Sequence, residues 1–553
     1  MSIDLLQLAK DWLAQDPDPA TRAELTALLD DQAALRDRFG AKLEFGTAGL
    51  RGELGAGPNR MNRVTVMRAA AGLAAVLGPG RLVVVGFDAR HNSDVFAKDT
   101  AAVLTGAGLR VALMSDRFPT PVLAFAVRHL GADAGVMVTA SHNPPRDNGY
   151  KVYWGDGTQI VPPVDEEISR AIDAVGRVDE LPLGDAWRTL GHADIVQPYL
   201  TAVGGLALGD ARELRVAYTP LHGVGGATLA AAFIQAGFKS PMMVGAQVRP
   251  DPDFPTVAFP NPEEPGAMDL ALELASAPAV QADIVLANDP DADRCAVGAR
   301  LPDGRFRMLT GDEVGGLIGE HVLRHTSDPD RLVATTIVSS SLLGKIAAEH
   351  GVVCRETLTG FKWIMKAGPG LVYGYEEALG YSVGSDAGLP VHDKDGIGAA
   401  LTIGAIAAQA RRDGRTLIDL LDDQARRYGL HATAQLSARV ADLSEITRAM
   451  DRLRAAPPAE LGGRTVESAE DLATGSAELP PTDGLRYRLS GGARIVVRPS
   501  GTEPKLKCYL EVVVPVTGEV AQARERATAE LAALKSDLAR ALGLEAGQNG
   551  QSA

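Results

Sequence analysis

Cysteine is scarce in this chain of 553 residues, where only Cys295, Cys354 and Cys508 occur. Three widely separated thiols supply neither a framework of disulfides nor the clustered ligands of a structural zinc site. We therefore expect buried, free thiols, which suit a reducing compartment such as the cytoplasm.

Long hydrophobic runs are also missing. The longest uncharged apolar stretch, 396–410, is shorter than the ~20 residues that a membrane-spanning helix needs. The first residues, MSIDLLQLAKDWLAQDPD, carry acidic side chains early and have no basic region before an apolar run, so they lack the pattern of a signal peptide. These features predict a cytoplasmic protein with no membrane partner.

Positive charge is in the minority, because 55 Lys and Arg residues stand against 70 Asp and Glu residues and leave a net charge of −15. A generally acidic surface argues against nucleic acid as a partner. It does not exclude an anionic small molecule, since such a ligand needs only a local cluster of basic residues. Hydrophobic residues make up 46% of the chain, which is enough for several buried cores.

Short β-rich runs separated by amphipathic helical stretches fill the middle of the chain. These runs lie at 81–87, 110–114, 134–139, 215–219, 282–288 and 332–338. Such alternation predicts α/β domains with parallel or mixed sheets. The first forty residues have helical periodicity instead. Beyond about residue 430, strands at 494–497 and 505–514 and a long charged helix at 519–542 predict a smaller α+β domain.

Turns rich in Gly, Asp and Pro near residues 205, 325 and 428 are the predicted domain boundaries. They delimit an N-terminal domain with its leading helices, two further α/β domains, a C-terminal α+β domain and a polar tail. The predicted ranges are 1–205, 206–325, 326–428, 429–545 and 546–553.

The first motif that carries chemistry is TASHNPP at 139–145, directly after an apolar strand. Ser141 therefore stands at the carboxyl end of a strand, where α/β sheets bind ligands. His142 is placed to orient or deprotonate it, and Lys151 follows ten residues later. The alternative is a local turn stabilised by a hydroxyl group before proline. A Ser–His neighbour pair is weak evidence for a hydrolytic triad, whose members come together across the fold.

The second motif is acidic, DPDADR, and also follows an apolar strand. Its three carboxylates, Asp289, Asp291 and Asp293, are hard oxygen ligands that suit Mg²⁺ or Ca²⁺. An EF-hand loop also begins D-x-D-x-D, but this chain has Arg294 and Arg300 where that loop needs Gly and Glu. A solvated acidic turn is the other alternative. Three acids after a buried strand would repel one another without a cation, so the motif favours a metal site.

The third motif, RPSGTEPK, lies between two predicted strands. Gly501 allows a close approach of the backbone to an anion, while Ser500 and Thr502 offer hydroxyl groups. Arg498 supplies a forked donor and Lys505 a point charge. This is the composition of a phosphate-binding loop, and a simple Ser-Gly-Thr hairpin turn is the alternative.

Two weaker motifs complete the set. GYEEALGY contains Glu376 and Glu377 between aromatic residues, a combination able to accept hydrogen bonds from sugar hydroxyls. FGTAGLRG is a Gly-rich turn that presents Arg51. It is not GxGxxG and follows no clear strand, so it predicts no dinucleotide site.

In this order, the five motifs resemble those of the α-D-phosphohexomutase superfamily, the phosphoglucomutase and phosphomannomutase enzymes, from about Phe45 to about Tyr509. The helical N-terminus and the segments GFDAR, TPLHGVGG and TLTGFKW look most like the branch of phosphoglucomutase-2-type enzymes. The resemblance implies four domains around a central cleft: three α/β domains and a smaller C-terminal domain able to swing over the substrate.

The resemblance also implies roles for individual residues. Ser141 would be a phosphoserine and Lys151 a candidate general base, and the phosphate on Ser141 would join the aspartates as a ligand of Mg²⁺. The implied catalytic residues are Ser141, His142, Lys151, Arg51 and Arg294, and the implied metal ligands are Ser141, Asp289, Asp291 and Asp293. The implied substrate-binding residues are Gly360, Lys362, Glu376, Glu377, Arg498, Ser500, Gly501, Thr502 and Lys505.

The implied activity is the interconversion of 1-phospho and 6-phospho hexoses, glucose or mannose, through a bisphosphorylated intermediate. Glucose 1,6-bisphosphate, or an equivalent bisphosphate, would then be intermediate and activator. Two alternatives are a phosphopentomutase acting on ribose or deoxyribose 1-phosphate and a metal-dependent sugar phosphatase. A non-catalytic sugar-phosphate sensor would usually have lost Ser141 or the aspartates. Many relatives have Glu-x-Ser in the sugar loop where this chain has Ala378, which leaves the sugar open.

Overall fold

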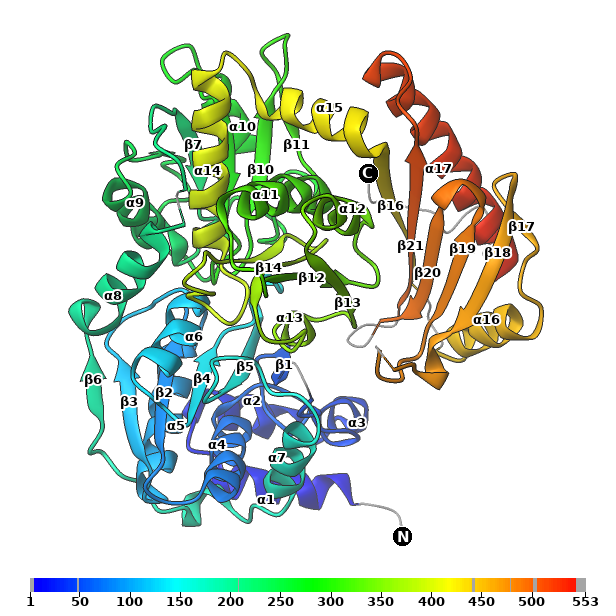
Figure 1. Cartoon of the computed structure of the whole chain (residues 1–553). Helices are drawn as coiled ribbons and strands as arrows, with labels where there is room; N and C mark the ends of the chain where they lie inside the picture. Colours follow the sequence, from blue (N-terminus) through cyan, green and yellow to red (C-terminus); the bar gives the residue numbers. More distant parts are fainter. Residues whose placement is uncertain are drawn as a thin grey trace. The chain divides into compact units, whose positions relative to one another are not determined.

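The computed structural model of the chain describes residues 4–46, 49–206, 208–439, 443–477, 479–500 and 505–543. The chain divides into two compact units, and Figure 1 labels their helices and strands. The first unit comprises Met1–Gly298, Tyr381–Val383 and Leu389–Ala405, and the second comprises Ala299–Gly380, Gly384–Gly388 and Ile406–Ala553. Among the described residues, no helix has the length and apolar character needed to cross a membrane.

Three short helices open the chain, as predicted: α1 (Leu5–Gln15), α2 (Pro19–Leu28) and α3 (Gln32–Phe39). Each begins at an aspartate, Asp4, Asp18 or Asp31, whose side chain accepts a hydrogen bond from a backbone N–H of the first turn. Such caps satisfy donors that a helix start otherwise leaves unpaired. Trp12 and Val64 share one buried cluster, so these helices pack on the first α/β domain.

The first sheet has six strands in the order β1-β5-β4-β2-β3-β6. Strands β2, β3, β4 and β6 are joined by parallel pairings, while β5 pairs antiparallel with both β4 and β1. The strands are β1 (Leu50–Glu53), β2 (Leu82–Phe87), β3 (Arg110–Met114), β4 (Ala134–Val138), β5 (Asp147–Trp154) and β6 (Arg188–Leu190). The helices are α4 (Arg63–Leu77), α5 (Ser93–Gly106), α6 (Thr120–His129), α7 (Val164–Asp173), the 3₁₀ turn Val178–Glu180 and α8 (His192–Gly204).

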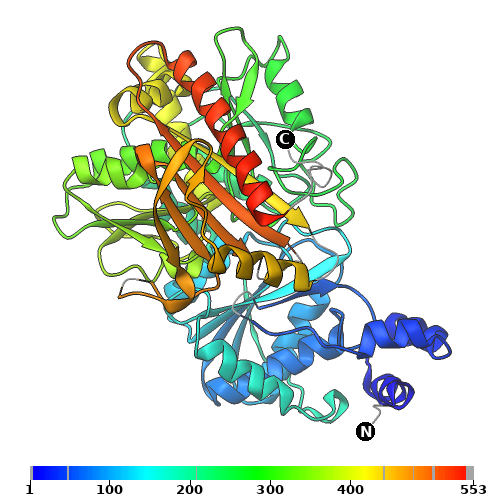
Figure 2. The same cartoon turned by 90° about the vertical axis from the view of Figure 1, so that its right-hand side faces the viewer.

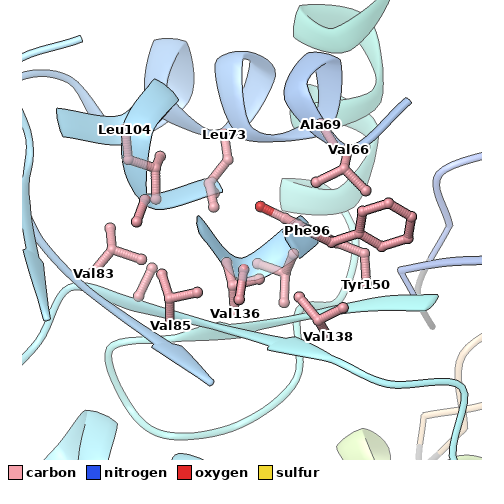
Figure 3. Close-up of a cluster of buried hydrophobic side chains, with 14 of the residues drawn as sticks. Val66, Ala69, Leu73, Val83, Val85, Phe96, Leu104, Val136, Val138 and Tyr150 are labelled. Carbon is pink, nitrogen blue, oxygen red and sulfur yellow. The ribbon is translucent and has the colours of Figure 1, made fainter. Parts of the chain in front are cut away.

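The core of this domain lies between the sheet and helices α4 and α5 (Figure 3). Val83 and Val85 of β2 face the same side because side chains alternate along a strand, and Leu73 of α4 and Leu104 of α5 cover them. The opposite face is covered by α6, since a Cβ atom at Gly86 would lie 2.9 Å from the side chain of Leu123. A sheet enclosed on both faces explains why its strands are almost uniformly apolar.

The second sheet has the order β11-β10-β9-β7-β8, with β7 parallel to both β8 and β9. Its elements are β7 (Val216–Thr219), α9 (Gly225–Gln235), β8 (Met242–Met243), α10 (Asp269–Ser276), β9 (Ile284–Ala287), β10 (Ala296–Arg300) and β11 (Phe306–Met308). The long apolar stretch of the sequence forms α14 (Gly396–Arg412), which packs on α9: a Cβ atom at Gly404 would lie 3.2 Å from the ring of Phe233.

The third sheet has the order β13-β12-β14-β15, with β12 parallel to β13 and β14. Its elements are α11 (Gly311–His325), β12 (Leu332–Thr336), α12 (Leu342–Glu349), β13 (Val353–Thr357), α13 (Phe361–Ile364), β14 (Leu371–Glu376), β15 (Gly380–Val383) and α15 (Leu417–Tyr428).

The C-terminal sheet is antiparallel throughout, in the order β16-β21-β20-β19-β18-β17. Its elements are β16 (Leu430–Arg439), α16 (Leu443–Ala455), β17 (Glu460–Leu461), β18 (Arg464–Asp471), β19 (Leu485–Leu489), β20 (Arg494–Pro499), β21 (Lys505–Val514) and α17 (Val520–Leu542), with 3₁₀ turns at Leu472–Thr474 and Ser490–Gly492. Helix α17 runs along this sheet in Figures 1 and 2. Leu534 and Leu538 of the helix belong to the same buried cluster as Ile495 and Leu510 of the sheet.

These elements confirm the predicted fold class, three α/β domains followed by an α+β domain. The three cysteines are free, with Cys295 and Cys508 buried and Cys354 partly buried. The structure differs from the sequence prediction at Arg51. That residue is not in a turn but in β1, where it pairs with Gly149 of β5. A four-residue edge strand is held by pairing with a distant segment, which local sequence patterns do not reveal. The domain limits near 205, 325 and 428 stay predictions.

Candidate active site

Ser141 stands three residues beyond the end of β4, in the first unit, and its side chain is buried. Its backbone has φ +52°, a left-handed conformation that is uncommon outside glycine. The Oγ atom donates a hydrogen bond to Asp289 Oδ2 at 2.7 Å and lies 3.2 Å from His142 Nδ1. The serine and the acidic turn, 148 residues apart in sequence, are therefore in direct contact.

The acidic turn follows β9 and buries all three carboxylates, with one oxygen from each of Asp289, Asp291 and Asp293 lying within 4.8 Å of the others. Among the described residues, Asp291 Oδ1 and Asp293 Oδ1 are buried and have no hydrogen-bond partner. Burial, with Asp291 and Asp293 beside it, raises the pKa of Asp289 well above its usual value. Converging buried carboxylates with unpaired oxygens fit a divalent cation that prefers oxygen ligands.

Lys151 lies on β5 and reaches this turn. Its Nζ atom donates to Asp291 Oδ2 at 2.7 Å and to Asp293 Oδ2 at 2.9 Å. Burial alone would lower the pKa of Lys151, but the two carboxylates outweigh burial and raise it. The side chain is therefore a cation in this geometry, and it would have to lose that proton before it could act as a base.

The other three residues of the predicted catalytic set are His142, Arg51 and Arg294, which lie near the serine or its direct neighbours. Burial, followed by the nearby charges of Arg294 and Arg51, holds the pKa of His142 well below its usual value, so its imidazole is neutral. The backbone N–H of Arg294 donates to Asp289 Oδ1 at 3.0 Å, and its side chain lies 3.6 Å from Glu263 Oε2. The first unit thus brings together the whole predicted catalytic and metal-binding set.

Two residues that sequence reasoning missed belong to the same cluster. Thr120, at the start of α6, donates its hydroxyl hydrogen to Asp291 Oδ2 at 2.6 Å. Lys394 is buried with its Nζ atom 3.3 Å from Asp293 Oδ2. The run HDKDG was a usable signal for Lys394, because a lysine between two aspartates is unusual in a buried segment. Nothing in the sequence around Thr120 marks it.

The sugar-loop residues predicted for substrate binding lie in the second unit. Glu376 ends β14, and the next residue, Glu377, accepts hydrogen bonds at its Oε2 atom from Ser339 Oγ at 3.1 Å and Thr336 Oγ1 at 3.4 Å. The backbone N–H of Glu377 also donates to Ser339 Oγ, at 3.2 Å. Ser339 thereby fixes this loop, a role that the sequence did not suggest.

The remaining predicted substrate residues also lie in the second unit. Gly360 has φ +104° at the start of α13, and Lys362 is buried within that helix. Arg498 is on β20, and burial raises the pKa of Tyr509 on β21 although the nearby charge of Arg498 acts to lower it. The backbone N–H of Ser500 donates to the carbonyl of Lys505 at 2.8 Å, so the backbone pairing of β20 with β21 extends to these two residues. The remaining two predicted residues of this loop, Gly501 and Thr502, lie outside the described residues.

The ionisation of Glu377 gives a testable pH dependence. Burial, together with Glu376 and Asp312, raises its pKa from 4.5 to about 8. Because the fold favours the neutral carboxyl, this residue should cost no stability below pH ~4.5 and progressively more between that value and about pH 8. Glu377→Gln, which cannot ionise, should therefore gain stability relative to the parent as pH rises from 5 to 9.

Urea unfolding at several pH values measures this difference. Glu467→Gln, at an exposed glutamate of β18, is the matched control and should show no such trend. A constant difference between Glu377→Gln and the parent across this range would contradict the buried, neutral carboxyl.

Comparison with known proteins finds three α/β domains followed by a C-terminal domain, the same order as in the structure. Models of phosphoglucomutase/phosphomannomutase alpha/beta/alpha domains I, II and III match residues 42–178, 197–301 and 310–428, and the C-terminal domain model matches 436–537. A Haemophilus influenzae protein named "Probable phosphomannomutase" is 44% identical over 82% of this chain and 93% of its own length. The chain belongs to the phosphoglucomutase/phosphomannomutase family. It is therefore an enzyme of the mutase class, an intramolecular phosphotransferase.

Further relatives differ in the sugar that their names give. A human phosphopentomutase is 34% identical over 91% of this chain and 90% of its own length. A solved structure of a phosphoglucomutase/phosphomannomutase family protein from Burkholderia thailandensis shares the fold, with a TM-score of 0.67 at 21% identity over 92% of this chain and 98% of that one. Membership of the family thus leaves hexose and pentose substrates both open.

Proposed function

We propose that this mutase interconverts 1-phospho and 6-phospho hexoses, glucose or mannose, with Ser141 as the carrier of the phosphoryl group. The observation that carries the proposal is the direct contact between Ser141 Oγ and the acidic turn, at 2.7 Å from Asp289. A hydroxyl beside a carboxylate cluster that fits a divalent cation is placed for phosphoryl transfer, which depends on positioning and charge neutralisation.

The reaction consists of two transfers. In the first, the Oγ–P bond of phosphorylated Ser141 breaks, a bond forms between phosphorus and a hydroxyl oxygen of the sugar phosphate, and the hydroxyl proton passes by way of a base to Ser141 Oγ. The product is a sugar bisphosphate and free serine. After the bisphosphate has reversed its orientation, the O–P bond of its other phosphate breaks, that phosphoryl group returns to Ser141 Oγ, and the proton of Oγ passes to the sugar oxygen that is released. No phosphate is lost to water.

The residues of the first unit share this work. Asp289, Asp291 and Asp293, with the phosphate on Ser141, would hold Mg²⁺, which when bound neutralises charge on the transferring group. Arg51 and Arg294 are cations near His142, the residue after the serine, and would suit the phosphoryl oxygens on Ser141. Neutral His142 lies within reach of Ser141 Oγ to orient it.

The residues of the second unit would bind the rest of the substrate. Glu376 and Glu377 would accept hydrogen bonds from sugar hydroxyls, with Gly360 and Lys362 helping to set the orientation of the sugar. The loop from Arg498 to Lys505 would hold the phosphate that is not being transferred, because a guanidinium, an ammonium and hydroxyl groups suit that anion.

A pentose substrate is the second candidate, favoured by the relatives named phosphopentomutase and by Ala378, which offers no hydroxyl group where many relatives have serine. Turnover of glucose 1-phosphate, mannose 1-phosphate and ribose 1-phosphate, measured side by side, tests the choice. Hexose specificity requires a higher kcat/KM for at least one hexose phosphate than for ribose 1-phosphate. A higher kcat/KM for ribose 1-phosphate than for both hexose phosphates would instead identify a phosphopentomutase. Stoichiometric release of inorganic phosphate would identify a phosphatase.

Arg498→Ala should lower kcat/KM by about tenfold to a hundredfold, because a charged hydrogen bond to phosphate is worth ~1.5–3 kcal/mol. The variant should also lose the bisphosphate more readily during its reorientation, so added glucose 1,6-bisphosphate should restore part of the rate. Arg488→Ala, at an exposed arginine of β19, is the control and should have normal kinetics. An unchanged kcat/KM in Arg498→Ala would place the phosphate-binding loop elsewhere.

A further inference from the structure

Arg90 is a buried arginine in the loop after β2, and only 4% of its surface is exposed. Its guanidinium donates four hydrogen bonds to backbone carbonyls of the loop that contains Ser141. Nη2 binds the carbonyls of Ser141 at 2.7 Å and Asn143 at 2.5 Å, and Nη1 binds those of Pro144 at 2.8 Å and Asp147 at 3.1 Å. Hydrogen bonds from a charged donor are stronger than neutral ones.

Asp88 holds the same loop from its other side. Its Oδ2 atom accepts a hydrogen bond from Thr139 Oγ1 at 2.7 Å, and Thr139 Oγ1 in turn accepts one from the backbone N–H of Ser141 at 2.8 Å. Asp88 Oδ2 also lies 3.6 Å from Arg90 Nε, so the buried charges balance. One aspartate–arginine pair therefore fixes both the N–H and the C=O of Ser141.

The serine loop needs such support. Ser141 keeps φ +52°, a conformation that persists only where surrounding contacts impose it. Within this loop, all of which the structure describes, backbone hydrogen bonds reach only the carbonyls of Ala140, from the N–H of Asn143 at 3.1 Å, and Pro144, from the N–H of Asp147 at 3.0 Å. Pro144 and Pro145 provide no N–H groups of their own, and the carbonyls of Ser141 and Asn143 are bound by Arg90. Without Arg90, several of these carbonyls would be left without their partner, and the loop would relax to a different backbone geometry.

The guanidinium is itself held in place by an aromatic ring. Its Cζ atom lies 5.1 Å from the centre of the ring of Phe254, which is buried in the loop after β8. Stacking of this kind fixes the plane of the guanidinium and with it the direction of its donors.

We propose that Arg90 is a positioning residue of the phosphoryl relay, which holds Ser141 Oγ in line for transfer by fixing the loop at four carbonyls. This inference rests on the proposed role of Ser141 as the phosphoryl carrier. Arg90 touches backbone carbonyls and not the reacting atoms, so its effect passes through the loop. A misplacement of about 1 Å can cost on the order of a hundredfold in rate. Replacement should therefore lower kcat and leave KM for the sugar phosphate nearly unchanged.

Arg90→Lys is the primary test, because lysine keeps the charge but cannot reproduce four bonds from a planar fork. Arg212→Lys is the matched control. Arg212 donates to the carbonyls of Ala236 at 2.7 Å and Ala211 at 2.8 Å and lies 5.0 Å over the ring of Phe238, in the same unit but outside the site. Both variants should lose stability, measured by thermal unfolding.

Three quantities distinguish the variants: kcat, KM, and the single-turnover rate at which phosphorylated protein passes its phosphate to the substrate. Intact mass follows the loss of phosphate from the protein, and kcat and the single-turnover rate are corrected for the folded fraction. Arg90→Lys should transfer at least thirtyfold more slowly with KM within about threefold of the parent, while Arg212→Lys transfers normally. A normal transfer rate in folded Arg90→Lys would overturn the inference and leave the proposed function intact. A parent that never carries phosphate on Ser141 would overturn the proposed function itself.

If Arg90→Lys does not fold, Phe254→Leu tests the positioning role of Arg90 instead. It leaves all four carbonyl bonds possible but removes the ring that orients the guanidinium. We expect a threefold to tenfold slower transfer at unchanged KM, against no change in the corresponding control Phe238→Leu. Equal transfer rates in these two variants would overturn the inference.

Discussion

Ser141→Ala should lower mutase turnover by about a thousandfold or more, because it removes the oxygen atom that carries the phosphoryl group between the two transfers. The variant should still fold, since alanine keeps the Cβ atom and loses only the two contacts of Oγ, with Asp289 and His142. Intact mass after incubation with glucose 1,6-bisphosphate should show one added phosphate on the parent and none on the variant.

Ser115→Ala is the matched control for that substitution. Ser115 also follows a strand of the first sheet, β3, but its side chain is exposed. Its replacement should leave both turnover and phosphorylation unchanged. Turnover near that of the parent in folded Ser141→Ala would rule out the relay, and an unphosphorylated parent with full activity would do the same.

The contact between Ser141 and Asp289 shows why part of this site could be predicted from sequence. Both residues follow short, apolar β runs, and the carboxyl ends of such strands are where α/β sheets bind ligands. Each motif also has a composition that is hard to explain by structure alone, three acids in one case and a serine, histidine and proline turn in the other. The local sequence pattern was therefore enough to identify Ser141 and the three aspartates as candidate site residues.

Arg90, Thr120 and Ser339 escaped prediction because their roles depend on contacts between distant segments. Arg90 reaches carbonyls 51 to 57 residues away, and Thr120 meets an aspartate 171 residues away. The segment GFDAR, which ends at Arg90, entered the resemblance without a role for that arginine, and the neighbours of Thr120 and Ser339 are ordinary for a helix start and a strand end. Only the packing of strands and helices within each unit brings Arg90 and Thr120 to the serine loop and the acidic turn, and Ser339 to Glu377.

Glu376 and Glu377 show a second limit of prediction from sequence, which is that it does not tell which way neighbouring side chains point. Sequence reasoning assigned Glu376 and Glu377 together to the sugar, but successive side chains at a strand end point to opposite sides. The carboxyl group of Glu377 meets Ser339 and Thr336, two residues at and after the end of the neighbouring strand β12. Its part in sugar binding stays a prediction, and its part in fixing the loop comes from the structure.

Removal of the metal ion, like Ser141→Ala, should have a large effect on turnover. Chelation with excess EDTA should inactivate the enzyme, and added Mg²⁺ should restore it, because the buried cluster of Asp289, Asp291 and Asp293 needs a cation to neutralise it during transfer. Asp291→Asn replaces one anionic ligand by a neutral one, while its amide oxygen is still able to accept the bonds from Thr120 and Lys151. The variant should therefore fold, bind Mg²⁺ at least tenfold more weakly, and turn over correspondingly more slowly at low Mg²⁺ concentration.

Two measurements separate a metal effect from general damage to the fold. Mg²⁺ should raise the unfolding temperature of the parent more than that of Asp291→Asn, since a ligand stabilises the folded state in proportion to its affinity. Asp303→Asn, at an exposed aspartate in the turn after β10, should respond to Mg²⁺ as the parent does. If the parent kept full activity in excess chelator, with no metal bound by elemental analysis, the three carboxylates would need another source of neutralisation. Lys151 and Lys394, already 2.9 and 3.3 Å from Asp293, would then be the groups that provide it.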